Sequence, residues 1–175
     1  YLYWKMKDKK NSFVCIGAVH TDYILQLQKN HFKNRTNPIT QKELLGGVAY
    51  NIALRLSFLK QNIELISLDC KNEIKKEILK NKIKFNPLTK KIFNRSYSTV
   101  LNNKGEMILG LANMDIYEKT HISTRMKELK NKNIIFDLNL SYKIINILIK
   151  KYSLNNYTCI CGTSAHKVSK VKNLL

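Results

Sequence analysis

The chain has 175 residues, of which 44% are hydrophobic, and this is enough apolar material to bury the core of one domain. No run of eighteen or more apolar residues occurs, so the sequence predicts no membrane-spanning helix. The formal charge of +19 raises the question of nucleic-acid binding. However, the lysines are scattered, only four of the 31 basic residues are arginine, and aromatic residues are not interleaved with them as a base-stacking surface requires. We therefore expect a positive field that attracts anionic nucleotides, and not a specific nucleic-acid-binding surface.

The four cysteines give no sign of a metal site. They stand at positions 15, 70, 159 and 161, and no second Cys or His pair at zinc-finger spacing accompanies them. Reduced thiols in a cytoplasmic protein are the expectation.

Alternating and apolar runs predict strands, and three- to four-residue apolar steps predict helices. The expected strands, in chain order, are 13–18, 23–27, 63–68, 96–101, 107–111, 134–137 and 157–161. The expected helices begin at 46 and then cover 72–80, 121–130, 141–151 and 164–174, with a loop at 29–40. The alternation of helices and strands predicts an α/β fold with a parallel sheet covered by helices. The interrupting strands, 96–101 and 107–111 among them, would form a small accessory sheet.

The first chemical motif follows the first buried strand. It reads Gly17-Ala-Val-His-Thr-Asp22. Ligands of open α/β sheets bind at the carboxyl ends of strands, and a carboxylate there can accept hydrogen bonds from two sugar hydroxyls. The alternative is that Asp22 caps a turn.

The second motif, Gly46-Gly-Val-Ala-Tyr-Asn51, opens a helix. Two glycines before a helix allow a ligand to approach the backbone, with helix-start amides pointing at it. Asn51 can offer both a donor and an acceptor from about one turn inside. The alternative is a Gly-Gly loop with a solvent-facing Asn51. The motif is not a Walker A loop, because no Gly-Lys-Ser/Thr follows.

Together these motifs resemble the N-terminal signature of the ribokinase-like (PfkB) carbohydrate kinases. Further segments are similar to the lid hairpin of that family and to its pseudouridine-kinase branch. They are Tyr97-Ser-Thr-Val-Leu-Asn-Asn-Lys-Gly-Glu-Met107, Leu111-Ala-Asn-Met-Asp-Ile116, Asp137-Leu-Asn-Leu-Ser141 and Thr163-Ser-Ala-His-Lys167. The resemblance covers residues 13–175, with lid segments at about 22–45 and 92–112 and a lead-in at 1–12.

The resemblance implies a set of substrate-binding residues and a reaction. Those that would hold ribosyl hydroxyls are Asp22, Gly46, Gly47 and Asn51, and Asn113, Asn139 and Lys167 match polar positions of the same cleft. For the last three, a turn, a helix cap and a solvated lysine are the alternatives. The implied reaction is transfer of phosphate from ATP, with Mg, to a sugar or nucleoside hydroxyl. Pseudouridine is the substrate that the resemblance favours most. A homodimer through the lid strands is the assembly that some relatives suggest.

The sequence departs from the family pattern at several points. His20 stands where the family usually has Asn, and Leu68-Asp-Cys-Lys-Asn-Glu73 replaces its Gly-x-Asp-x-x-Gly. No Gly-Ala-Gly-Asp, the motif that supplies the family's catalytic Asp, occurs in the chain. We therefore expect a C-terminally truncated kinase fold without a catalytic residue of its own. It would be an excerpt of a working kinase, a decayed gene product or, as the alternative function, a non-catalytic nucleoside- or RNA-binding remnant.

Overall fold

A parallel sheet forms the centre of the molecule. The computed structural model describes residues 12–120 and 127–171. Its five strands are β1 (Ser12–Ile16), β4 (Asn62–Ser67), β5 (Lys84–Pro87), β8 (Asn133–Asp137) and β9 (Tyr157–Cys161). They run parallel in the order β5-β4-β1-β8-β9.

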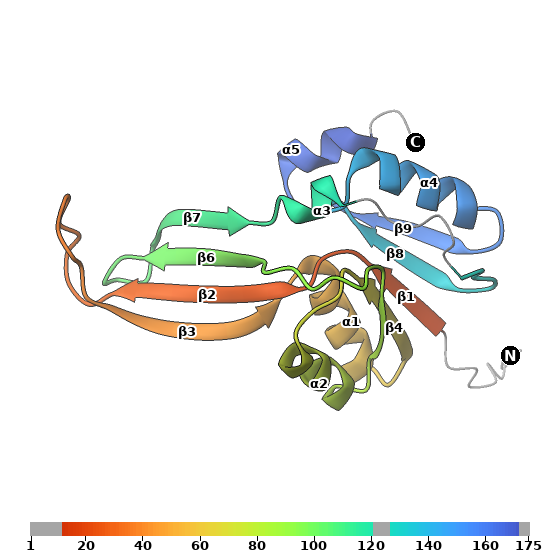
Figure 1. Cartoon of the computed structure of the whole chain (residues 1–175), viewed down its shortest axis with the longest axis horizontal. Helices are drawn as coiled ribbons and strands as arrows, with labels where there is room; N and C mark the ends of the chain where they lie inside the picture. The colour runs from red at the N-terminus through yellow and green to blue at the C-terminus, as the bar shows by residue number, and fades with distance from the viewer. Residues whose placement is uncertain (1–11, 121–126, 172–175) are drawn as a thin grey trace, which may run out of the picture.

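Helices cover both faces of this sheet (Figure 1). On one side lie α1 (Val48–Phe58) and α2 (Asn72–Lys80), and on the other α4 (Tyr142–Tyr152), α5 (Ala165–Val168) and a 3₁₀ turn (Ser169–Val171). Each side has its own apolar cluster, since Ala49 and Ala53 of α1 pack in one and Ile145 and Leu148 of α4 in the other. Covering both faces explains why the central strands β1 and β8 are nearly continuous apolar runs.

A second, four-stranded sheet, which we call the lid, extends away from the central sheet (Figure 1). It consists of β2 (His20–Leu27), β3 (Ile39–Gly46), β6 (Ser96–Leu101) and β7 (Met107–Asn113) in the order β3-β2-β6-β7. The strands β2 and β6 are parallel, and the other two pairings are antiparallel. The short helix α3 (Ile116–Lys119) follows β7 and returns the chain to the central sheet.

The predicted fold class, a helix-flanked parallel sheet with an accessory lid, is confirmed. The strand β3 was not expected, because its sequence Ile-Thr-Gln-Lys-Glu-Leu-Leu-Gly is largely polar and most of its side chains are exposed. The short edge strand β5 was also missed, since Pro87 signals a break and in fact ends that strand. Of the helix expected at 121–130, residues 121–126 lie outside the described part of the chain, and 127–130 are not helical. The last expected helix consists of α5 and the 3₁₀ turn as far as residue 171.

None of the helices described is both long and apolar enough to cross a bilayer.

Candidate functional site

A buried carboxylate at the end of β8 joins three segments. Asp137 Oδ2 accepts hydrogen bonds from the backbone amides of Ala18 (2.7 Å) and Ala49 (3.1 Å). Asp137 Oδ1 accepts one from the amide of Asn139 at 2.9 Å. Gly17 packs against the same carboxylate, because a Cβ atom on Gly17 would lie 2.2 Å from Asp137 Cγ. Asp137 therefore fixes where the loop after β1, the start of α1 and the loop after β8 meet.

Asp137 is an architectural group. Its side chain is completely buried, and burial raises its pKa, an effect that the three backbone donors oppose. A carboxylate without exposed surface has no direct access to a ligand. The sequence contained one signal for it, an acidic residue that ends an apolar strand.

The glycine pair is required by close packing on both sides. A Cβ atom on Gly46 would lie 2.0 Å from Asp22 Oδ2, and one on Gly47 would lie 2.2 Å from the carbonyl oxygen of Ala18. Gly47 also has φ +110°, a backbone conformation that favours glycine. The pair thus brings the lid carboxylate and the loop after β1 against the start of α1.

The first amides of α1 are bonded within the protein. The Ala49 amide donates to Asp137, that of Tyr50 to the Ala18 carbonyl (3.4 Å), and that of Asn51 to the Gly47 carbonyl (2.8 Å). The expectation that helix-start amides point at a ligand therefore does not hold for these three. The Asn51 side chain is exposed, as either interpretation of that residue allows.

Asp22 is the third residue of β2 and does not cap a turn. Its side chain is about one-third exposed (34%), and His20 Nε2 lies 2.9 Å from its Oδ1 atom. Residues two apart in a strand share a face, so both side chains lie on the same side of the lid. Asp22 Oδ1 is close enough to His20 for an ion pair but is buried without a hydrogen-bond partner among the described residues, while Oδ2 lies against Gly46.

His20 is largely buried, and burial lowers its pKa. The nearby carboxylates of Asp22 and Asp137 oppose that shift, while the charge of Arg95 adds to it. His20 Nδ1 is buried and has no hydrogen-bond partner among the described residues. A protonated ring would leave an unpaired N–H there, which is consistent with a neutral imidazole.

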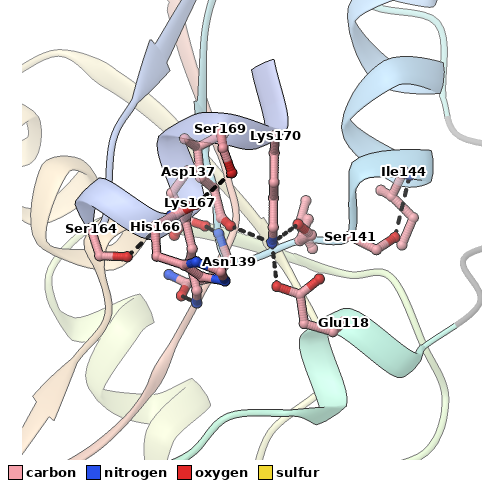
Figure 2. Close-up of polar contacts among 12 residues, drawn as sticks. Glu118, Asp137, Asn139, Ser141, Ile144, Ser164, His166, Lys167, Ser169 and Lys170 are labelled. Carbon is pink, nitrogen blue, oxygen red and sulfur yellow. Dashed lines mark hydrogen bonds and ion pairs between the residues drawn. The ribbon is translucent and has the colours of Figure 1, made fainter. Parts of the chain in front are cut away.

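Two lysines hold the loop after β8 (Figure 2). Lys167 Nζ donates to Asn139 Oδ1 at 2.7 Å. Lys170 Nζ donates to the carbonyls of Leu138 and Leu140, both at 3.0 Å, and pairs with Glu118 of α3. The pKa of Lys167 is lowered by burial and, after that, by the charge of Lys170. Because the Asn139 oxygen accepts from Lys167, its NH₂ group is the donor, and the Asn139 side chain also hydrogen-bonds to the Asp137 carboxylate, which opposes the rise in the pKa of Asp137.

The sequence-derived residues fall into two groups. Asp22, Gly46 and Gly47 pack together, Asn51 follows one turn inside α1, and Asn139 and Lys167 connect to them through Asp137. Asn113 is separate. It pairs with Ser96, which pairs with Thr21, so strand alternation places all three side chains on the lid face opposite Asp22.

On that opposite face Asn113 helps to line a cavity of about 530 Å³. Residues of the lid and of the start of α2 line this cavity, Tyr23, Glu43, Lys71 and Glu73 among them. His20 also contributes to its wall, whereas Asp22 does not. The structure therefore does not bring Asn113 together with the other predicted residues.

Comparison with solved structures identifies the architecture. A carbohydrate kinase from Agrobacterium tumefaciens superposes with a TM-score of 0.78 at 19% identity, over 93% of this chain and 57% of that one. The chain has the ribokinase fold. A nucleoside kinase from Methanocaldococcus jannaschii, described as an archaeal member of the ribokinase family, gives a TM-score of 0.68 at 16% identity, over 86% of this chain and 52% of that one. A Cryptococcus neoformans ribokinase in complex with ADP gives 0.66 at 12% identity, over 86% and 50%.

Sequence comparison gives a curated relative. The chain is 27% identical over 177 aligned residues to a pseudouridine-metabolizing bifunctional protein of Schizosaccharomyces pombe. The alignment covers 95% of this chain and 24% of that protein, so the chain spans about a quarter of the length of its curated relative. No family model matches the sequence. The solved structures and the curated relative together confirm the resemblance to ribokinase-like kinases.

Proposed function

We propose that this chain forms the sugar-binding part of a kinase that phosphorylates a sugar or nucleoside hydroxyl, and that its first candidate substrate is pseudouridine. The observation that carries the proposal is the packing of the Asp22 carboxylate onto Gly46, at the point where the lid meets the start of α1. The S. pombe relative, whose name refers to pseudouridine metabolism, supports the choice of nucleoside.

The site suits a ligand that has hydroxyl groups near Asp22 and a hydrogen-bond acceptor near Asn139. Asp22 Oδ2 is a strong acceptor for hydroxyl donors, and the missing side chains of Gly46 and Gly47 let this carboxylate and the Ala18 carbonyl pack against the start of α1. The Asn139 side chain is held by Lys167 and by Asp137, and the second N–H of its NH₂ group is the donor that we assign to the ligand. A ribosyl ring with a carbonyl-bearing base offers both kinds of partner.

A kinase also needs a phosphoryl donor, and we propose ATP with Mg²⁺. ATP supplies the transferred phosphoryl group, and the metal neutralises the charge that develops on it. Within residues 12–120 and 127–171 no group of three His, Cys, Asp or Glu side chains is arranged to hold a metal ion. The role proposed for the described residues is to bind and orient the sugar.

Calorimetric titration of the chain with pseudouridine tests the proposal. We expect binding by the wild-type chain, at least a tenfold loss with Asp22→Ala (about 1.4 kcal/mol or more), and no change with Glu106→Ala. Glu106 is a suitable control because it is an exposed lid carboxylate in the connection between β6 and β7. Equal binding by the Asp22 variant and the wild-type chain would show that the sugar does not bind at this carboxylate.

A phosphorylation assay with ATP then separates binding from catalysis. Turnover of pseudouridine that Asp22→Ala abolishes would contradict the expectation of a chain without a catalytic residue. Salt-sensitive retention of RNA without a response to nucleosides would favour the alternative, a non-catalytic binding protein.

A further inference from the structure

Three of the connections between the lid and the central sheet run close together (Figure 1), and the residues that meet there are buried. Val19 immediately precedes β2, Arg95 immediately precedes β6, and Tyr117 lies on α3, which follows β7. These three residues, which we call the lid clamp, are far apart in sequence and bond to one another. No motif or spacing in the sequence connects them.

Tyr117 holds both backbone groups of Val19. Its hydroxyl accepts a hydrogen bond from the Val19 amide at 2.7 Å and donates one to the Val19 carbonyl at 2.8 Å. The same hydroxyl lies 3.1 Å from Ser67 Oγ, at the end of β4. The Tyr117 side chain is only 1% exposed, so water cannot replace these partners.

Arg95 completes the clamp with a set of backbone partners. Its guanidinium donates to the carbonyls of Val19 (2.5 Å), Leu68 (2.8 Å), Asp69 (2.7 Å) and Phe93 (3.2 Å). It also lies over the Tyr117 ring, 5.4 Å from the ring centre. The residue is only 7% exposed, and carbonyl dipoles with an aromatic face, in place of a carboxylate, stabilise its charge.

The clamped residue is adjacent to the candidate site. Val19 is followed directly by His20, and Asp22 lies two residues further along the same strand. On the other side, Ala18 bonds to Asp137 and packs against Gly47. Fixing both backbone groups of Val19 therefore fixes the direction in which β2 leaves the central sheet, and with it the place of the Asp22 carboxylate.

We propose that Arg95 and Tyr117 are positioning residues, which hold Val19 so that Asp22 faces the sugar. The clamp also limits how the lid moves, since a swing about its base has to break the Val19 hydrogen bonds. The test of this inference by ligand affinity rests on the function proposed above.

The matched pair Tyr117→Phe and Tyr152→Phe tests the proposal. Both tyrosines are 1% exposed, and the Tyr152 hydroxyl donates one hydrogen bond, to the Lys127 carbonyl at 2.8 Å, outside the lid clamp. At a temperature where both variants are folded, we expect Tyr117→Phe to raise the Kd for pseudouridine about five- to tenfold, and Tyr152→Phe to change it by less than about twofold. Equal changes in Kd would reduce Tyr117 to a stabilising residue and overturn the proposal.

Amide hydrogen exchange provides a readout that needs no ligand. In Tyr117→Phe we expect the Val19 amide and the first amides of β2 to exchange faster, while the amides of β4 and β8 keep their wild-type rates. Unchanged exchange at Val19 would overturn the clamp even if pseudouridine binds. Faster exchange at Val19 in a chain that does not bind pseudouridine would support the clamp and refute the proposed function.

Arg95→Lys tests the fork geometry of the guanidinium. Lysine keeps the charge, but its ammonium cannot reach the same set of carbonyls in the plane of a guanidinium. We expect this variant to reproduce the exchange and affinity changes of Tyr117→Phe. Wild-type exchange rates and a wild-type Kd would show that Arg95 is not part of the lid clamp.

Discussion

Asp22 and Gly46 belong to antiparallel neighbouring strands of the lid, and the carboxylate of the first occupies the space that a side chain on the second would fill. Gly46 is paired with His20, so the glycine lies diagonally across from Asp22 on the same face. This contact sets the depth at which the carboxylate lies above the start of α1. It also makes the glycine a requirement of the site and not merely of the turn that follows.

Gly46→Ala should therefore weaken ligand binding while leaving the fold in place. A methyl group 2.0 Å from Asp22 Oδ2 forces the carboxylate to move, and we expect at least about a tenfold rise in Kd for pseudouridine by calorimetry. Gly105→Asn is the control, because Gly105 has φ +85° in a hairpin turn with open space around it, and Asn tolerates that conformation. If the Gly46→Ala variant binds as tightly as the wild-type chain, the contact is not part of the site.

His20 should make stability depend on pH. Its pKa in the folded chain is lowered, chiefly by burial, so the unfolded chain binds the proton more readily. The free energy of unfolding should accordingly fall as the pH drops through the unfolded value of about 6.5 toward the lower folded pKa. The charged groups acting on the ring are Asp22, Asp137 and Arg95.

Urea unfolding of the wild-type chain and His20→Asn between pH 5 and 8 measures this effect. The difference between the two free energies should be constant above about pH 7.5 and should change below about pH 6.5 in the direction that disfavours the wild-type chain. Parallel profiles for the two proteins would mean that His20 does not contribute.

The sequence predicted those parts of the site that depend on local pattern. The Gly17-to-Asp22 spacing after a buried strand and the glycine pair before a helix can both be read along the chain. The cap of α4 is equally local, since Ser141 Oγ accepts from the Ile144 amide at 3.4 Å. Each of these features depends on residues fewer than ten positions apart.

The parts that were missed depend on long-range contacts. Asp137 bonds to amides 88 and 119 positions away, and Tyr117 bonds to Val19 across 98 positions. Asn113 was placed in the wrong group for the same reason. The sheet face on which its side chain lies is determined by the pairing of β6 with β7, which the sequence does not show. Neither composition nor spacing carries that information.

Lys167→Met should weaken binding through Asn139. Without the ammonium that donates to Oδ1, the Asn139 amide loses one of the contacts that fix its orientation. We expect a Kd for pseudouridine about three- to tenfold higher, the cost of losing one oriented hydrogen bond. Lys150→Met, an exposed change in the last turn of α4, is the control and should leave the Kd unchanged. Equal effects of the two substitutions would show that only the overall positive charge matters.

Asp137→Asn should destabilise the fold more than any change on the site surface. The two carboxylate oxygens accept three backbone N–H groups, so an amide in either orientation points its NH₂ at one or more donors. Because the position is completely buried, we expect the free energy of unfolding to fall by about 2–4 kcal/mol. Asp115→Asn, at an exposed Asp–Lys pair on α3, should cost less than about 1 kcal/mol. Urea denaturation of both variants measures the difference, and a loss at Asp137 no larger than that at Asp115 would contradict its role in joining the loop after β1, the start of α1 and the loop after β8.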